Sequence, residues 1–197
     1  MNNLTALVAG MILLFFSVAC SGCIGYQMSP AQPAAIPIGE KEMVPSDERI
    51  MKLPDWMYIP MTDSVSGKDI TLSSLISLEK PLIIQTFTIW CPACTYQLQE
   101  TSLLMREAPG RYQLLAIDIE RNEDKERILG HIMRNNFSEG YYVSAPDEVL
   151  RGLVDVFGQR IILTMPQTAV ICNETVYLFN PGAIPAPRLQ QSLEELC

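Results

Sequence analysis

The chain has 197 residues, of which 14 are Lys or Arg and 22 are Asp or Glu, so its formal net charge is −8. This acidic balance argues against a nucleic-acid partner and against electrostatic attraction to anionic lipids. Six cysteines are present. Their positions carry most of the functional information, because cysteine usage depends on the redox compartment.

Residues 4–19 form an apolar run that ends in small residues before Cys20 and Cys23. The run is shorter than the roughly 20 residues of a membrane-spanning helix and is typical of a signal-peptide hydrophobic region. Residues 21–23 resemble a prokaryotic lipobox, although no Lys or Arg precedes Lys41. We therefore expect residues 1–23 to be a lipoprotein signal peptide with lipidation at Cys23; Cys20 and an uncleaved signal anchor are the alternatives. Each alternative places the remaining chain outside the cytoplasm at a membrane surface.

Residues 24–45 are rich in Pro and Ala and show almost no hydrophobic periodicity, which predicts a linker. Residues 46–197 form the expected globular domain. The part after the leader, about 175 residues, is long enough for one domain with a hydrophobic core.

The globular part alternates strand-like and helix-like segments. Short strands are expected at 55–62 and 69–72, on either side of a turn-type segment. An apolar, β-branched run at 82–88 predicts a strand that is covered on both faces. The order of elements predicts an α/β domain with a mixed sheet. The later segments are expected as helices at 95–108, 124–135, 147–157 and 187–196 and as strands at 114–119, 141–144, 167–171 and 175–179.

The sequence Trp90-Cys91-Pro92-Ala93-Cys94 lies between the predicted strand 82–88 and the helix that follows it. Two cysteines three residues apart at a helix start can form a disulfide with each other. Backbone N–H groups and the helix dipole favour a thiolate on the first of them. This pattern indicates thiol–disulfide exchange.

Two cysteines lie outside the leader and the motif. Cys172 and Cys197 are an even pair, which suits either a disulfide in an oxidising compartment or two unrelated free thiols. His131 is the single histidine and lies far from the motif in sequence. An ordinary surface or hydrogen-bonded role fits it better than a catalytic one.

These features together resemble the thioredoxin fold, and more narrowly the membrane-tethered TlpA/ResA-type thiol–disulfide oxidoreductases and their lipoprotein relatives. The resemblance covers roughly residues 56–196 and implies a thioredoxin-like three-layer fold with a mixed central sheet, an N-terminal β-hairpin and a strand–helix insert. The matching positions are Gly-Lys-Asp-Ile-Thr-Leu at 67–72, Trp-Cys-x-x-Cys at 90–94, the insert at 141–157, the family's cis-proline at Pro166, and Gly182 in the last part of the chain.

The resemblance also implies roles for individual residues. Cys91 would attack a target disulfide and Cys94 would resolve the mixed disulfide. Trp90, Met165 and Pro166 would line the site for an extended substrate segment.

Two positions depart from the family pattern. Gln85 stands where thioredoxin has a buried acid, and Gln97 and Gln99 replace the usual glutamate and proline after the second cysteine. A proton acceptor for Cys94 is therefore not evident in the sequence.

The thioredoxin-like layout further places Cys172 near Cys197. It predicts a structural disulfide that closes a loop of about 25 residues and contributes about 3 kcal/mol. A Cα separation beyond about 7 Å would exclude this bond.

The function expected from all of this is an extracytoplasmic, membrane-tethered thiol–disulfide oxidoreductase. A reductase or isomerase is favoured over an oxidant, because Pro92 and Ala93 provide no histidine between the cysteines. We expect client protein thiols and disulfides and a membrane electron donor as partners, a monomer, and no cofactor or metal. The alternatives are an extracytoplasmic copper-handling module and a non-catalytic docking domain.

Overall fold

The computed structural model describes residues 42–43 and 53–197, apart from residues 77, 79, 121–122, 138 and 174. The predicted leader with Cys20 and Cys23, and most of the predicted linker, lie outside the described residues. The strands are β1 (Glu42–Met43), β2 (Met61–Thr62), β3 (Asp69–Ile70), β4 (Leu82–Phe87), β5 (Gln113–Asp118), β6 (Tyr141–Ser144), β7 (Gln167–Cys172) and β8 (Thr175–Leu178). The helices are η2 (Asp55–Tyr58, a 3-10 helix), α1 (Leu72–Ile76), α2 (Pro92–Glu107), α3 (Lys125–Asn135), α4 (Asp147–Phe157), α5 (Arg160–Leu163) and α6 (Ala186–Leu196).

The main sheet has the strand order β1-β8-β7-β4-β5-β6, and β2 pairs with β3 in a separate two-stranded sheet. Strands β4, β5 and β6 are parallel to one another. Strand β7 is antiparallel to β4, β8 is antiparallel to β7, and β1 is antiparallel to β8. The predicted α/β class with a mixed sheet, an N-terminal hairpin and a strand–helix insert is confirmed.

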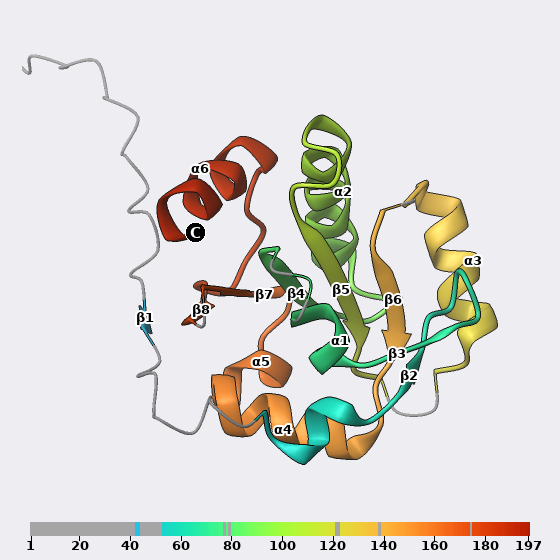
Figure 1. Ribbon diagram of the computed structural model, residues 1–197. Helices are drawn as coiled ribbons and strands as arrows, with labels where there is room; N and C mark the ends of the chain where they lie inside the picture. The colour runs from blue at the N-terminus through green and yellow to red at the C-terminus, as the bar shows by residue number, and fades with distance from the viewer. Residues whose placement is uncertain are drawn as a thin grey trace, which may run out of the picture. The chain divides into compact units, whose positions relative to one another are not determined.

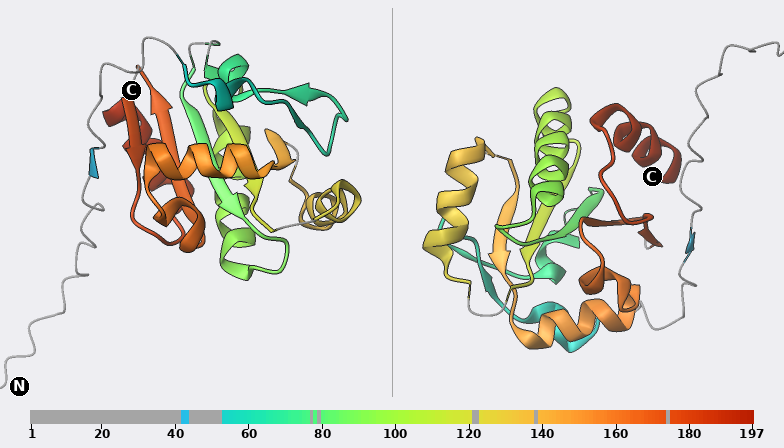
Figure 2. Two further views of the ribbon diagram at one scale, coloured as in Figure 1. Left: turned by 90° about the horizontal axis from the view of Figure 1, so that it is seen from below. Right: turned by 180° about the vertical axis from the view of Figure 1, so that it is seen from behind.

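Helices cover both faces of this sheet (Figures 1 and 2). Helices α2, α3 and α6 pack on one face, where their buried side chains form a first core cluster with residues of β4, β5 and β6. Helices η2, α1, α4 and α5 pack on the other face around a second cluster. This is the three-layer arrangement that the resemblance implied.

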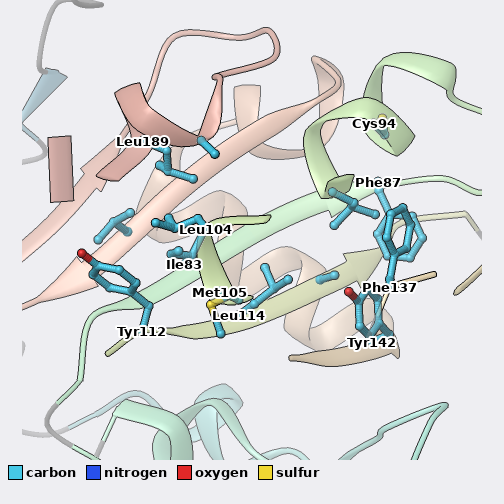
Figure 3. Close-up of a cluster of buried hydrophobic side chains, with 14 of the residues drawn as sticks. Ile83, Phe87, Cys94, Leu104, Met105, Tyr112, Leu114, Phe137, Tyr142 and Leu189 are labelled. Carbon is cyan, nitrogen blue, oxygen red and sulfur yellow. The ribbon is translucent and has the colours of Figure 1, made fainter. Parts of the chain in front are cut away.

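Strand β4 shows why the sheet is central. All six of its residues are buried, and its four apolar residues divide between the two clusters: Ile83 and Phe87 belong to the first, and Leu82 and Ile84 to the second. A strand that buries both faces requires an apolar, β-branched sequence. Figure 3 shows the Phe87, Phe137 and Tyr142 rings at the end of the first cluster where Cys94 also lies.

The structure differs from the sequence prediction at the N-terminal edge of the domain. Residues 55–58 form the 3-10 helix η2 instead of a strand, because Trp56 packs against α4, where its indole occupies the space that a Cβ on Gly152 would need. Leu72 begins the short helix α1 instead of ending a strand. Thr71 and Ser74 cap that helix by hydrogen bonds between each side chain and the other's backbone N–H, at 3.1 and 3.2 Å.

Two further differences concern single segments. Residues Glu42–Met43, inside the predicted linker, form strand β1 at the sheet edge. The short helix α5 was not predicted. On α3, Ile128 and Ile132 are buried, whereas the side chain of Met133, which follows Ile132, is 73% exposed.

Candidate active site

The Cys-x-x-Cys segment forms the turn from β4 into α2. Cys91 is the N-cap of α2, with an extended backbone, and Pro92 occupies the first helical position, where its missing N–H would have no helical partner. The backbone N–H of Cys94 donates to Cys91 Sγ at 3.2 Å. The helix start therefore directs a donor and its positive dipole end at the Cys91 sulfur.

The two motif cysteines are joined in a disulfide, with Cα atoms 5.3 Å apart. Cys91 is 8% exposed and Cys94 is 1% exposed. A partner molecule can therefore reach Cys91 more easily than Cys94. This difference agrees with the attacking and resolving roles that the sequence predicts for them.

The Met165–Pro166 peptide bond is cis. Gln167, the first residue of β7, pairs with Thr86 near the end of β4. Pro166 therefore lies at the same end of the sheet as the motif, which follows β4. Met165 packs against the cluster that contains both motif cysteines. The topology thus places Met165 and Pro166 at the same end of the sheet as the predicted disulfide.

Trp90 lies on the surface beside the motif. Its side chain is 62% exposed, and its indole Nε1–H donates to Glu120 Oε2 at 3.0 Å. The neighbouring Ile89 is half-buried against the first cluster. An exposed indole that is held by a hydrogen bond can contact a substrate without first being ordered.

Gln85 and Gln97, two of the three glutamines that depart from the resembled pattern, form a buried amide network around Thr101. Gln85 Nε2 donates to Thr101 Oγ1 at 2.7 Å, and Gln97 Nε2 donates to the same oxygen at 3.1 Å. Gln97 Oε1 also accepts from the backbone N–H of Ile184 in the segment before α6. Neutral amides do not take up a proton, so this network links β4, α2 and the C-terminal segment but does not act as a base.

Asp118 is a functional candidate that sequence reasoning did not identify. It ends β5 and is 1% exposed, and burial raises its pKa from 3.8 to about 7. The Glu120 N–H donates to its Oδ1 at 2.7 Å and opposes that shift, whereas the carboxylates of Glu123 and Glu120 add to it. The sequence signal that could have identified Asp118 is its position, since it is a carboxyl residue at the end of a strand whose preceding residues, Leu114 to Ile117, are apolar.

His131 lies closer to the motif than its sequence position indicated. It is 5% exposed, and its Nε2 lies 3.4 Å from Thr95 Oγ1. The Thr95 hydroxyl donates in turn to the Cys91 carbonyl at 3.2 Å. The imidazole also stacks on Phe87, with ring centroids 6.3 Å apart. Burial, followed by the charge of Arg134, lowers the pKa of His131, which favours a neutral ring that supports the first turn of α2.

Cys172 and Cys197 form a second disulfide, with a Cα separation of 5.8 Å. This value lies inside the limit that the sequence prediction set. Cys172 ends β7 and Cys197 follows α6, so the bond fixes the C-terminus to the sheet.

Two searches cover the described residues only. Along them, no helix combines the length and apolar character that crossing a bilayer requires. In the same part of the chain, no three His, Cys, Asp or Glu side chains are grouped as metal ligands.

No family model and no curated protein matches the chain significantly, but solved structures resemble it. The thioredoxin-family thiol:disulfide interchange protein of Chlorobium tepidum TLS aligns with a TM-score of 0.57 and 16% identity over 70% of this chain and 91% of its own. A secreted Mycobacterium tuberculosis disulfide oxidoreductase homologous to E. coli DsbE aligns with a TM-score of 0.54 and 17% identity, over 71% of this chain and 96% of its own. The exposed lipoprotein thioredoxin of Streptococcus pneumoniae TIGR4 aligns with a TM-score of 0.55 and 18% identity, over 70% of this chain and 98% of its own.

This likeness establishes the fold. The chain is a thioredoxin-fold protein with a Cys-x-x-Cys disulfide and a cis-proline at the same end of its sheet.

Proposed function

We propose that the chain is a thiol–disulfide oxidoreductase whose working pair is Cys91 and Cys94. One observation carries the proposal: the pair forms a disulfide at the start of α2, where the Cys94 N–H points at Cys91 Sγ. After reduction, the same N–H and the helix start stabilise a thiolate on Cys91. The solved thioredoxin-family oxidoreductases of the same fold support this proposal.

The reaction is two successive exchanges. The Cys91 thiolate attacks one sulfur of a client disulfide, forms a mixed disulfide and releases one client thiol. The Cys94 thiolate then attacks Cys91 Sγ, re-forms the Cys91–Cys94 bond and releases the second client thiol. The client gains two electrons and two protons, and the dithiol loses them. Because Cys94 is almost fully buried, this second step occurs within the chain.

Trp90, Met165 and Pro166 are the proposed client contacts. Trp90 has an exposed indole and precedes Cys91, and we propose that the backbone of Met165, next to the cis-proline, contacts an extended client segment. We assign the chain to the reducing or isomerising direction, since neither residue between the cysteines can stabilise the thiolate with a positive charge. This direction requires a membrane electron donor.

The proposal includes an extracytoplasmic, lipid-anchored location. The sequence before and at Cys23 supports it, as does the presence of a secreted and an exposed lipoprotein protein among the similar structures. In a bacterial host fed a radiolabelled fatty acid, the full chain is expected to take up label and Cys23→Ala to lose it. The matched Cys20→Ala variant is expected to stay labelled. Labelling that follows Cys20 instead, or that is absent from the wild type, would contradict the assignment.

Insulin reduction with dithiothreitol as the electron source tests the activity. Wild type is expected to accelerate the reaction, whereas Cys91→Ser is expected to fall to the background rate because the attacking sulfur is gone. The matched control is Cys172→Ser combined with Cys197→Ser, which keeps the motif and should retain activity at 25 °C. Equal rates for wild type and Cys91→Ser would refute the proposal. Tight 1:1 Cu(I) binding without turnover would favour the copper-handling alternative.

A further inference from the structure

Asp118 shares the sheet face on which the motif cysteines lie. It pairs in register with Phe87 of β4 and Ser144 of β6. Side chains alternate along a strand, and Leu114 and Ala116 of β5 belong to the cluster that contains Cys91 and Cys94. The Asp118 side chain therefore points to that face, beside the Phe87 ring that packs in the same cluster.

The hydrogen bonds of Asp118 connect it to the residue before Cys91. Its Oδ1 accepts from the Glu120 N–H at 2.7 Å, and the Glu120 carboxylate accepts from the Trp90 indole at 3.0 Å. Its Oδ2 is buried and has no hydrogen-bond partner among the described residues. A carboxyl that is half satisfied and fully buried is costly to ionise.

The other titratable groups around Asp118 come from each neighbouring element. The following loop supplies Glu120 and Glu123, and α3 supplies Arg127 and His131. Strand β6 supplies Tyr142, whose pKa is raised to about 12 by burial, so it stays neutral. Arg127 pairs with Glu123 at 3.1 Å. The β4–α2 side supplies the two motif cysteines, with the neutral Gln85 network beside them.

We propose that Asp118 is a positioning residue that couples the charge of a buried carboxyl to the charge of the Cys91 thiolate. The proposal rests on the proposed function only in requiring that the Cys91–Cys94 pair can be reduced. Reduction adds two electrons and two protons to the disulfide, and loss of one proton leaves the Cys91 thiolate. The carboxylate and the thiolate repel each other. Each therefore raises the other's affinity for a proton, which comes from solvent.

This coupling has a definite sign. Ionised Asp118 disfavours the Cys91 thiolate and hence the reduced form, so it makes the dithiol a better reductant above neutral pH. Two like charges in a partly buried site, at an effective dielectric of about 20 and with salt screening, change an equilibrium by about three- to tenfold. Below pH 6 Asp118 holds its proton, and the effect disappears.

The test is the equilibrium of the reduced chain with glutathione at pH 5.5 and pH 8.5, together with the titration of the Cys91 thiolate by its ultraviolet absorbance. Asp118→Asn keeps an acceptor for the Glu120 N–H but cannot ionise. At pH 8.5 it is expected to shift the equilibrium toward the dithiol by about three- to tenfold and to lower the pKa of Cys91. At pH 5.5 it should match wild type.

The matched control is Glu126→Gln, which removes an exposed carboxylate from the first turn of α3. It is expected to change the equilibrium less than about twofold at either pH, because solvent screens exposed charges. Equal shifts for the two variants, or a shift at Asp118→Asn that is the same at both pH values, would overturn the proposal.

A second measurement needs no substitution. Carbon-13 NMR of the Asp118 carboxyl in wild type should give a higher pKa in the reduced chain than in the oxidised chain, and equal values would also overturn the proposal. Both experiments measure equilibria. A chain that shows this coupling but does not reduce insulin would therefore refute the proposed function alone.

Discussion

Replacing Cys94 with serine is expected to stop turnover and to leave the chain covalently joined to its client. The backbone N–H that donates to Cys91 Sγ belongs to residue 94 and is independent of its side chain. The helix start that favours the Cys91 thiolate is also retained. The first exchange therefore proceeds, whereas the second lacks its attacking sulfur and the mixed disulfide accumulates.

Non-reducing gels and intact-mass measurement check this expectation with a disulfide-bonded peptide or insulin as client. One adduct per chain should form at Cys91 and disappear on addition of dithiothreitol. The Cys91→Ser variant should form none, because Cys94 is only 1% exposed. Multiple turnovers by Cys94→Ser, or an adduct that maps to Cys172 or Cys197, would show that another thiol carries the reaction.

The trapped adduct would also give access to the client site. Trp90 and Met165 are the proposed client contacts, and Trp90 is already held by Glu120 before a client binds. Cross-linking or NMR of the adduct would place the client segment relative to the cis-proline. The same preparation from cell envelopes would identify natural clients, which the chemistry of the site defines only as accessible disulfides.

The parts of the fold that were predictable from the sequence are those determined by local patterns. The run at 82–88 is apolar on both faces and forms β4, and the helix expected from hydrophobic periodicity at 147–157 is α4 with the same bounds. The 3-10 helix at Asp55–Tyr58 was missed because tertiary packing decides it: Trp56 fits against a glycine on α4, nearly 100 residues away.

The candidate site also contains one part that local sequence patterns predict and another part that only the tertiary structure brings together. The motif at 90–94 is contiguous and has a chemical reason at each position, so the sequence alone indicated it. Asp118 and His131 join the site only through the sheet register and through the packing of α3 against Phe87. Neither relation is encoded in local spacing. Gln85 is recognisable in the sequence as a departure, but its hydrogen bond to Thr101 and the contact of Gln97 with the C-terminal segment depend on tertiary packing.

Removing the second disulfide is expected to give the largest loss of stability among the substitutions considered, with little loss of activity at 25 °C. The Cys172–Cys197 bond closes a loop with a sequence separation of 25, for which chain-entropy estimates give about 3 kcal/mol. At this chain length that corresponds to a fall in Tm of about 6–12 °C. The double variant Cys172→Ala with Cys197→Ala removes both partners of this bond, so neither is left as an unpaired thiol, and it is the protein to measure.

Thermal unfolding without reductant gives the comparison, with Cys91→Ala combined with Cys94→Ala as the matched control. That control also removes one disulfide, but the sequence separation is only 3, so the entropy model predicts a smaller loss.

Helix α6 should stay docked in the first variant, because Leu189 and Leu193 are buried in the core cluster and Glu100 accepts from the Ala186 N–H at 2.7 Å. Insulin reduction should therefore persist. An unchanged Tm would mean that these contacts alone hold the C-terminus, and equal losses for the two double variants would rule out loop closure as the source of the stabilisation.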